Sequence, residues 1–137
     1  MRDIKFRGKR VDNGQWVYGY LLVYKDGTNT ITTEAERTFT HNINGKPFYS
    51  IYSKECEVIP ETVGQYTGRK DMNDKEIYEG GRVKNNICFE GFWIGIVTFD
   101  EKLACFVINN DSTQQFMYDT DLEVIGNIYE NSELVKP

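Results

Sequence analysis

The sequence has few of the residues that build metal sites or disulfide frameworks: three cysteines and a single histidine. Cys56, Cys88 and Cys105 lie far apart, form no Cys-x-x-Cys pair and cannot all pair within one chain. This spacing predicts reduced, partly buried thiols and no bound metal or other cofactor. His41 lies in a weakly patterned segment. An exposed loop histidine is the simplest interpretation, and a Cys–His dyad stays open as an alternative.

Signals for membranes, secretion and common catalytic sites are also missing. The longest apolar stretch is too short to span a bilayer, and the N-terminal residues lack the apolar region of a signal peptide. We therefore expect a cytoplasmic protein with no membrane partner. The chain contains no Walker A, Gly-x-Gly-x-x-Gly or Gly-x-Ser-x-Gly motif. Residues 71–74 begin like a calcium loop but lack its central Gly and closing Glu. These absences favour a protein that is not an enzyme.

What the sequence does contain are strand signals, since aromatic residues make up 14% of the chain and suit pleated, half-buried surfaces. The fold class is predicted to be mainly β. In an N-terminal subdomain of residues 1–60, strands are expected over 4–7, 16–24 and 48–52. The polar segment 28–47 is expected to form a long loop or a loosely ordered hairpin, with a short strand near Ile31 and an Asn-Gly turn at residues 44–45.

The second subdomain, residues 61–137, is expected to be a small SH3-like barrel, although the two subdomains can also form one unit. Residues 65–80 predict a hairpin, with Tyr66 and Tyr78 packed as cross-strand aromatics. Five short strands follow over 82–84, 93–99, 105–109, 114–117 and 124–128, opened by a Gly-Gly turn. Gly126 predicts either a β-bulge inside the last strand or a close approach of another backbone. Asn131 is expected to cap a short C-terminal helical turn.

Two motifs carry a resemblance to a known family. Residues 65–80 read Gln-Tyr-Thr-Gly-Arg-Lys-Asp-Met-Asn-Asp-Lys-Glu-Ile-Tyr-Glu-Gly, and residues 123–134 read Glu-Val-Ile-Gly-Asn-Ile-Tyr-Glu-Asn-Ser-Glu-Leu. With Lys-Phe-Arg at residues 5–7, the whole chain resembles the YopX family of phage and prophage proteins. The resemblance implies a mainly β fold and a bacterial host cytoplasm, but no established activity. Asp74 and Gly81 depart from the family's Gly and Asp, and Asp74 can still adopt a left-handed conformation.

Charge supplies the candidate binding residues, because the formal net charge is -5 but the cations are clustered. The candidate binding surface consists of Lys5, Arg7, Lys9 and Arg10 near the N-terminus and of Arg69 and Lys70 at the hairpin tip. Residues 118–133 carry five acids and no Lys or Arg. One interpretation is contact between subunits, basic end to acidic end.

We expect a non-enzymatic phage or prophage accessory protein that binds protein partners, as a homo-oligomer or with a phage or host protein. The main alternative is a nucleic-acid-binding small-barrel module, because small barrels bind strands through basic grooves and exposed aromatics. The acidic net charge argues against that alternative. A low-activity enzyme is the third hypothesis.

Overall fold

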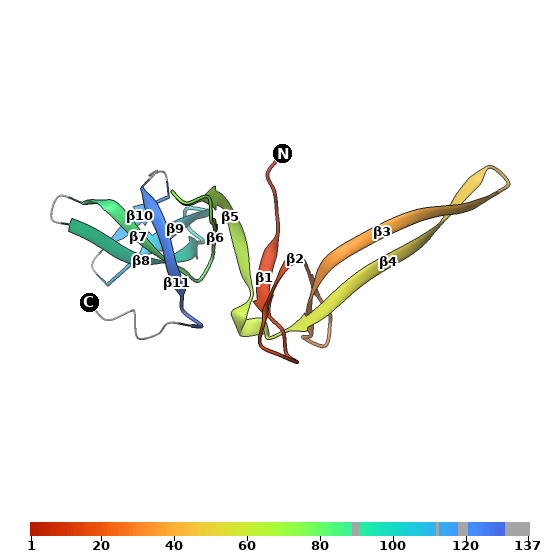
Figure 1. Ribbon diagram of the computed structural model, residues 1–137, viewed down its shortest axis with the longest axis horizontal. Coiled ribbons are helices and arrows are strands. Elements are labelled where there is room, and N and C mark those ends of the chain that lie inside the picture. Colours follow the sequence, from red (N-terminus) through yellow and green to blue (C-terminus); the bar gives the residue numbers. More distant parts are fainter. Residues whose placement is uncertain (89–90, 112, 118–120, 131–137) are drawn as a thin grey trace. The chain divides into compact units, whose positions relative to one another are not determined.

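The structure is a computed structural model that describes residues 1–88, 91–111, 113–117 and 121–130 (Figure 1). It confirms the mainly β fold class, and the described residues contain no α-helix, only a single 3₁₀ turn, η1 (Pro60–Thr62). The strands are antiparallel throughout. The chain divides into two compact units, residues 5–63 and residues 1–4 with 64–137.

The N-terminal unit contains four strands: β1 (Phe6–Lys9), β2 (Trp16–Val23), β3 (Asn29–Ile43) and β4 (Lys46–Val58). They lie in the order β4-β3-β2-β1. The small core of this unit is formed where β3 and β4 meet the shorter strands, and it contains Ile31, Cys56 and Val58. Thr62 of η1 closes it, because its hydroxyl accepts the backbone N–H of Lys9 at 2.9 Å.

Of the two structures expected for residues 28–47, the long loop is wrong, and the hairpin is present with longer strands than expected. Residues 29–43 are one continuous strand, paired with β4 along its full length from Asn29–Val58 to Ile43–Lys46. The turn between them is Asn44-Gly45, with φ angles of 51° and 80°. Two positive φ angles define the type I′ turn, whose twist matches the flanking strands, and this turn sets the register of the whole hairpin.

The C-terminal unit opens with the hairpin of β5 (Gly64–Lys70) and β6 (Glu76–Tyr78), as predicted. Tyr66 and Tyr78 are cross-strand partners, both are buried, and their ring centroids lie 5.5 Å apart. The prediction of a packed aromatic pair is confirmed. Asp74 in the tip has a φ of 64°, so the residue that replaces the family's Gly does adopt the left-handed conformation.

A five-stranded sheet makes up the rest of this unit: β7 (Gly81–Cys88), β8 (Gly91–Asp100), β9 (Cys105–Asn109), β10 (Gln114–Phe116) and β11 (Leu122–Asn127). Their order is β10-β9-β8-β7-β11, and a bulge separates Val124 from Gly126 as predicted. The expected SH3-like barrel is not confirmed, because no pairing of β10 with β11 closes the sheet within the described ranges. The helical turn expected at Asn131 lies outside the described residues.

The core of the C-terminal unit lies between this sheet and the hairpin. Its buried members come from five different strands and the end of β10, and they are Ile77, Val83, Val97, Ile108, Met117 and Leu122. The last strand therefore contributes to the same core as the hairpin. Backbone contacts reinforce this connection, since Met72 at the hairpin tip donates its N–H to the carbonyl of Leu122 at 2.8 Å.

Asp71 is a buried carboxylate that fixes the tip of the hairpin to β11. One oxygen accepts the backbone N–H groups of Asn73 and Lys75, both at 2.8 Å, and the other accepts the N–H of Val124 at 2.8 Å. Burial alone would raise the pKa of Asp71, but these three donors more than offset it, and the pKa is lowered. Asp71 thus holds the scaffold together, which explains its turn sequence without a calcium ion.

Candidate binding surface

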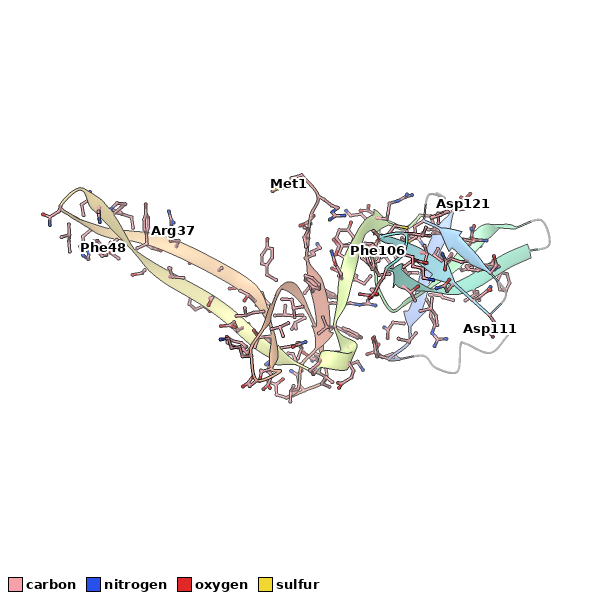
Figure 2. The ribbon with its side chains drawn as sticks, turned by 180° about the vertical axis from the view of Figure 1, so that it is seen from behind. Met1, Arg37, Phe48, Phe106, Asp111 and Asp121 are labelled. Atoms are coloured by element: carbon pink, nitrogen blue, oxygen red, sulfur yellow. The ribbon has the colours of Figure 1, made fainter. Side chains whose placement is uncertain are left out.

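The part of the β3–β4 hairpin beyond the small core has no cover on either face. We call residues 34–55 the arm. Every residue from Glu34 to Glu55 is exposed. Strand dimensions give the whole β3–β4 hairpin a length of about 40 Å. Figure 1 shows this hairpin extending beyond β1 and β2, and Figure 2 shows Arg37 and Phe48 in its outer part.

Large apolar and aromatic side chains are concentrated on the arm. Ile51 is 77% exposed and Tyr52 is 54% exposed, and the other members are Phe39, Ile43, Phe48 and Tyr49. A soluble protein rarely exposes so many large side chains along one element unless a partner covers them. An isolated two-stranded hairpin is also only marginally stable in water. Both facts make the arm the candidate binding surface of this protein.

Contacts along the arm order these side chains in cross-strand groups. The Arg37 guanidinium lies 3.8 Å from the centre of the Tyr49 ring, and Phe39 packs edge-on against the same ring at 6.0 Å. On the opposite face His41 stacks on Phe48, with ring centroids 5.3 Å apart. Ordered aromatic side chains lose little entropy on binding, so the arm presents a pre-arranged surface.

Charge is divided along the arm. Its outer part, residues 37–51, contains Arg37 and Lys46 and neither Asp nor Glu. Lys54 lies opposite Glu34, at the end near the core. The acids Glu34, Glu36 and Glu55 lie at the end near the core, and Glu57 follows immediately. The carboxylate of Glu55 accepts hydrogen bonds from the hydroxyls of Tyr24, at 3.0 Å, and of Thr30, at 2.8 Å. Sequence reasoning misses this surface because the pattern of residues 28–47 indicates only a long loop or a loosely ordered hairpin, with no binding role.

The predicted basic surface is divided between the two units and engaged in contacts within the chain. Arg7 and Lys9 lie on the same side of β1, and their charged groups are 4.8 and 5.7 Å from the centre of the Trp16 ring. Each gains a cation–π interaction there. Lys5 is half-buried and precedes the same strand. The structure therefore brings Arg7 and Lys9 together at one indole ring.

The other three predicted residues also have partners. Arg10 forms a two-bond ion pair with Asp12, at 2.6 and 2.9 Å, which raises the pKa of Arg10 and lowers that of Asp12. Lys70 is 3.6 Å from Asp74, and Arg69 donates to the carbonyl of Met117. The role of the six predicted residues in binding stays a prediction. The arm differs from this basic surface because it exposes large apolar side chains.

Chemical sites are sparse in the described part of the chain. No group of three or more His, Cys, Asp or Glu side chains there is arranged to hold a metal ion. Cys56 is a buried free thiol and Cys105 a half-buried one. Cys105 lines a shallow pocket of about 300 Å³ in the C-terminal unit, with Arg2, Arg69, Phe99 and Phe116. No described helix is long or apolar enough to cross a membrane.

The fold and the arm define a mainly β protein with an extended, exposed hairpin. The chain belongs to the YopX family: the family model described as YopX protein matches residues 5–136. A solved structure with a similar fold is protein EF1440 from Enterococcus faecalis, 20% identical, with a TM-score of 0.59 over 99% of this chain and 100% of that one. The search of curated proteins found no match.

Proposed function

We propose that this protein is a phage- or prophage-derived accessory protein of the bacterial cytoplasm that binds protein partners, including copies of itself, and catalyses no reaction. The observation that carries the proposal is the arm, whose outer part exposes aromatic, Ile and Arg side chains. Tyr, Phe and Arg are enriched at protein interfaces and dominate their binding energy. The phage context rests on what membership of the YopX family implies.

The C-terminal unit fits a binding module of SH3-like type. Its last strand, β11, returns to pair with β7 rather than extending the meander beyond β10. This arrangement brings the first and last of the five strands together, as a small barrel requires. We therefore retain the SH3-like architecture as part of the proposal, with β10 and β11 as the strands that would meet on closure.

Nucleic-acid binding is the second candidate function, and one observation favours it. Residues 37–51 combine two cations with exposed aromatic rings, the combination that single-stranded nucleic acids bind. The adjoining acids Glu34, Glu36 and Glu57 lower the positive potential of this region, as does the net charge of -5. Protein binding is therefore the better supported of the two functions.

The test uses a variant that lacks the arm but keeps the core of its unit. Glu34 and Lys54 are cross-strand partners, so residues 35–53 can be replaced by an Asn-Gly turn between them. Tagged parent and shortened proteins are used to capture partners from prophage-induced cells, with and without nuclease. We expect the parent alone to retain protein partners after nuclease treatment. Equal capture by both proteins would refute the role of the arm, and loss of all partners with nuclease would favour the second function.

A further inference from the structure

Two Asn-Gly dipeptides occur in the sequence, at residues 13–14 and 44–45, and each lies in a turn between two antiparallel strands. Asn-Gly is chemically reactive, because Gly has no side chain to hinder its own backbone nitrogen. That nitrogen attacks the amide carbon of the Asn side chain and closes a five-membered succinimide ring. The N–H proton passes through water to the departing amide group, which leaves as ammonia. A water molecule then opens the ring at one of its two carbonyls and gives Asp or isoaspartate.

In the first of these turns, both reacting groups are held in hydrogen bonds. The side-chain oxygen of Asn13 accepts the backbone N–H of Gln15 at 2.9 Å. Gly14 donates its N–H, the nucleophile of the reaction, to the carbonyl of Arg10 at 3.0 Å. The N–H of Arg10 closes the same turn on the carbonyl of Gln15 at 2.9 Å. These bonds must break before residue 13 can form a ring.

In the second turn, the same two groups are available. Asn44 and Gly45 are both exposed. Within the part of the chain that the structure describes, neither the Asn44 side chain nor the Gly45 N–H takes part in a hydrogen bond. The pair that closes this turn is Ile43 with Lys46, on either side of the dipeptide. The amide and the nucleophile of residues 44–45 therefore react without first losing a partner.

The two turns also differ in what opposes their opening. Ring closure twists the backbone out of its turn conformation, so each turn must open briefly before it reacts. The first turn is tied to the base of β4, because Val11 donates its N–H to the carbonyl of Glu57 at 3.0 Å, and Ile59 donates to that of Lys9 at 2.8 Å. The second turn ends a two-stranded hairpin with no cover on either face, and such a hairpin is marginally stable.

We propose that Asn44 is a site of spontaneous deamidation, and that Asn13 is protected from the same reaction by the fold. Isoaspartate carries the main chain through the former side chain, so the turn gains one backbone atom. A two-residue loop sets the register of the hairpin, and a lengthened loop no longer fits it. The Ile43–Lys46 pair is then lost first. The inference is independent of the proposed function: it gives the tip of the arm a shorter lifetime than the two cores.

The test follows both dipeptides in one sample of the full chain, incubated at neutral pH. Peptide mass spectrometry with chromatographic separation measures Asn, Asp and isoaspartate at residues 13 and 44. In the folded protein we expect residue 44 to convert at least about tenfold faster, because the bonds around Gly14 keep the first turn closed. In urea that unfolds the chain, we expect the two rates to agree within about threefold, since both sites are then Asn-Gly in an open chain.

Asn44→Gly is the control variant, because Gly-Gly also forms a type I′ turn and has no side-chain amide. Backbone amide exchange over residues 41–48 is expected to become faster as the parent ages and to stay constant in the variant. Equal rates at the two sites in the folded chain would overturn the proposal. A tenfold difference that persists in urea would also overturn it, since neighbouring residues and not the fold would then protect Asn13. Equal ageing of parent and variant would show that deamidation does not disrupt the arm.

Discussion

Asp71 offers the sharpest test of how the C-terminal unit is held together. Replacing it by Asn changes one atom in a buried group that accepts three backbone hydrogen bonds. The amide oxygen can keep the two bonds from Asn73 and Lys75, but without a negative charge. The amide nitrogen then faces the N–H of Val124, donor against donor, and that N–H loses its partner.

The cost can be worked from these contacts. A hydrogen bond to a charged group contributes about 1.5–3 kcal/mol, and a buried N–H left unsatisfied costs about 1–3 kcal/mol. The two terms overlap for Val124, so we expect Asp71→Asn to lower the free energy of unfolding by about 2–4 kcal/mol. Asp74→Asn is the matched control in the same turn. Asn tolerates the left-handed φ of residue 74, and the effect there is expected to stay within about 0.5 kcal/mol.

The assay is urea unfolding followed by the fluorescence of Trp93 in β8. All proteins carry Trp16→Phe, so the signal reports on the C-terminal unit alone. Because the pKa of Asp71 is lowered in the folded state, its stabilisation is fully present above the ordinary carboxyl pKa and is lost as the pH falls below it. The difference between parent and Asp71→Asn should therefore be constant near neutral pH and shrink below about pH 4. Equal stability of the two Asn variants, or a difference that grows on acidification, would refute the reasoning.

Three further predictions follow from burial. Replacing residues 35–53 by Asn-Gly should change the unfolding free energy of the N-terminal unit by less than about 1 kcal/mol, because every removed side chain is exposed. The measurement is thermal unfolding followed by the fluorescence of Trp16. A larger loss would mean that the arm stabilises its own unit. Tyr66→Ala should cost about 3–5 kcal/mol and Lys70→Ala at most about 0.5 kcal/mol, and similar melting temperatures would contradict a core role for the ring pair. In timed thiol titration half-buried Cys105 should react well before buried Cys56, and the reverse order would contradict their placement.

The β5–β6 hairpin and the five strands of the C-terminal sheet could be predicted from the sequence because burial leaves a pattern. Tyr66 and Tyr78 flank a tip rich in turn formers, and their side chains are buried as the pattern requires. Gly126 inside a strand predicted its bulge, because a residue without a side chain is rarely placed there for packing. The pairing of β11 with β7 could not be predicted, since it depends on contacts between strands far apart in the sequence.

The arm could not be predicted by the same reasoning, because alternation of apolar and polar residues arises only when one face of a strand is buried. Residues 34–43 are exposed on both faces, so they show no period, and their register comes from the turn at Asn44-Gly45 and from cross-strand pairs. Two signals were available: the Asn-Gly dipeptide itself, and the β-branched and aromatic residues on both sides of it. Together they indicate a hairpin even without alternation.

The predicted basic surface shows a second limit of sequence reasoning. Counting cations near the N-terminus identifies Arg7, Lys9 and Arg10, but it does not show that Arg7 and Lys9 lie over the Trp16 ring or that Arg10 pairs with Asp12. A cation over an indole ring or paired with a carboxylate is less available to another molecule than one in open solvent. The outer arm has fewer cations, yet it combines them with exposed aromatic side chains.

The bond between Asp71 and Val124 also bears on how the protein is made. It joins residues 53 positions apart, and the same strand supplies Leu122 to the core and a carbonyl to Met72. During synthesis the hairpin tip emerges long before β11 does, and closing so large a loop is slow compared with forming a local hairpin. The N-terminal unit, whose strands β1 to β4 all lie within residues 5–63, can begin to fold while translation continues. The core of the C-terminal unit needs the last strand to leave the ribosome, so we expect the arm to form before that core does.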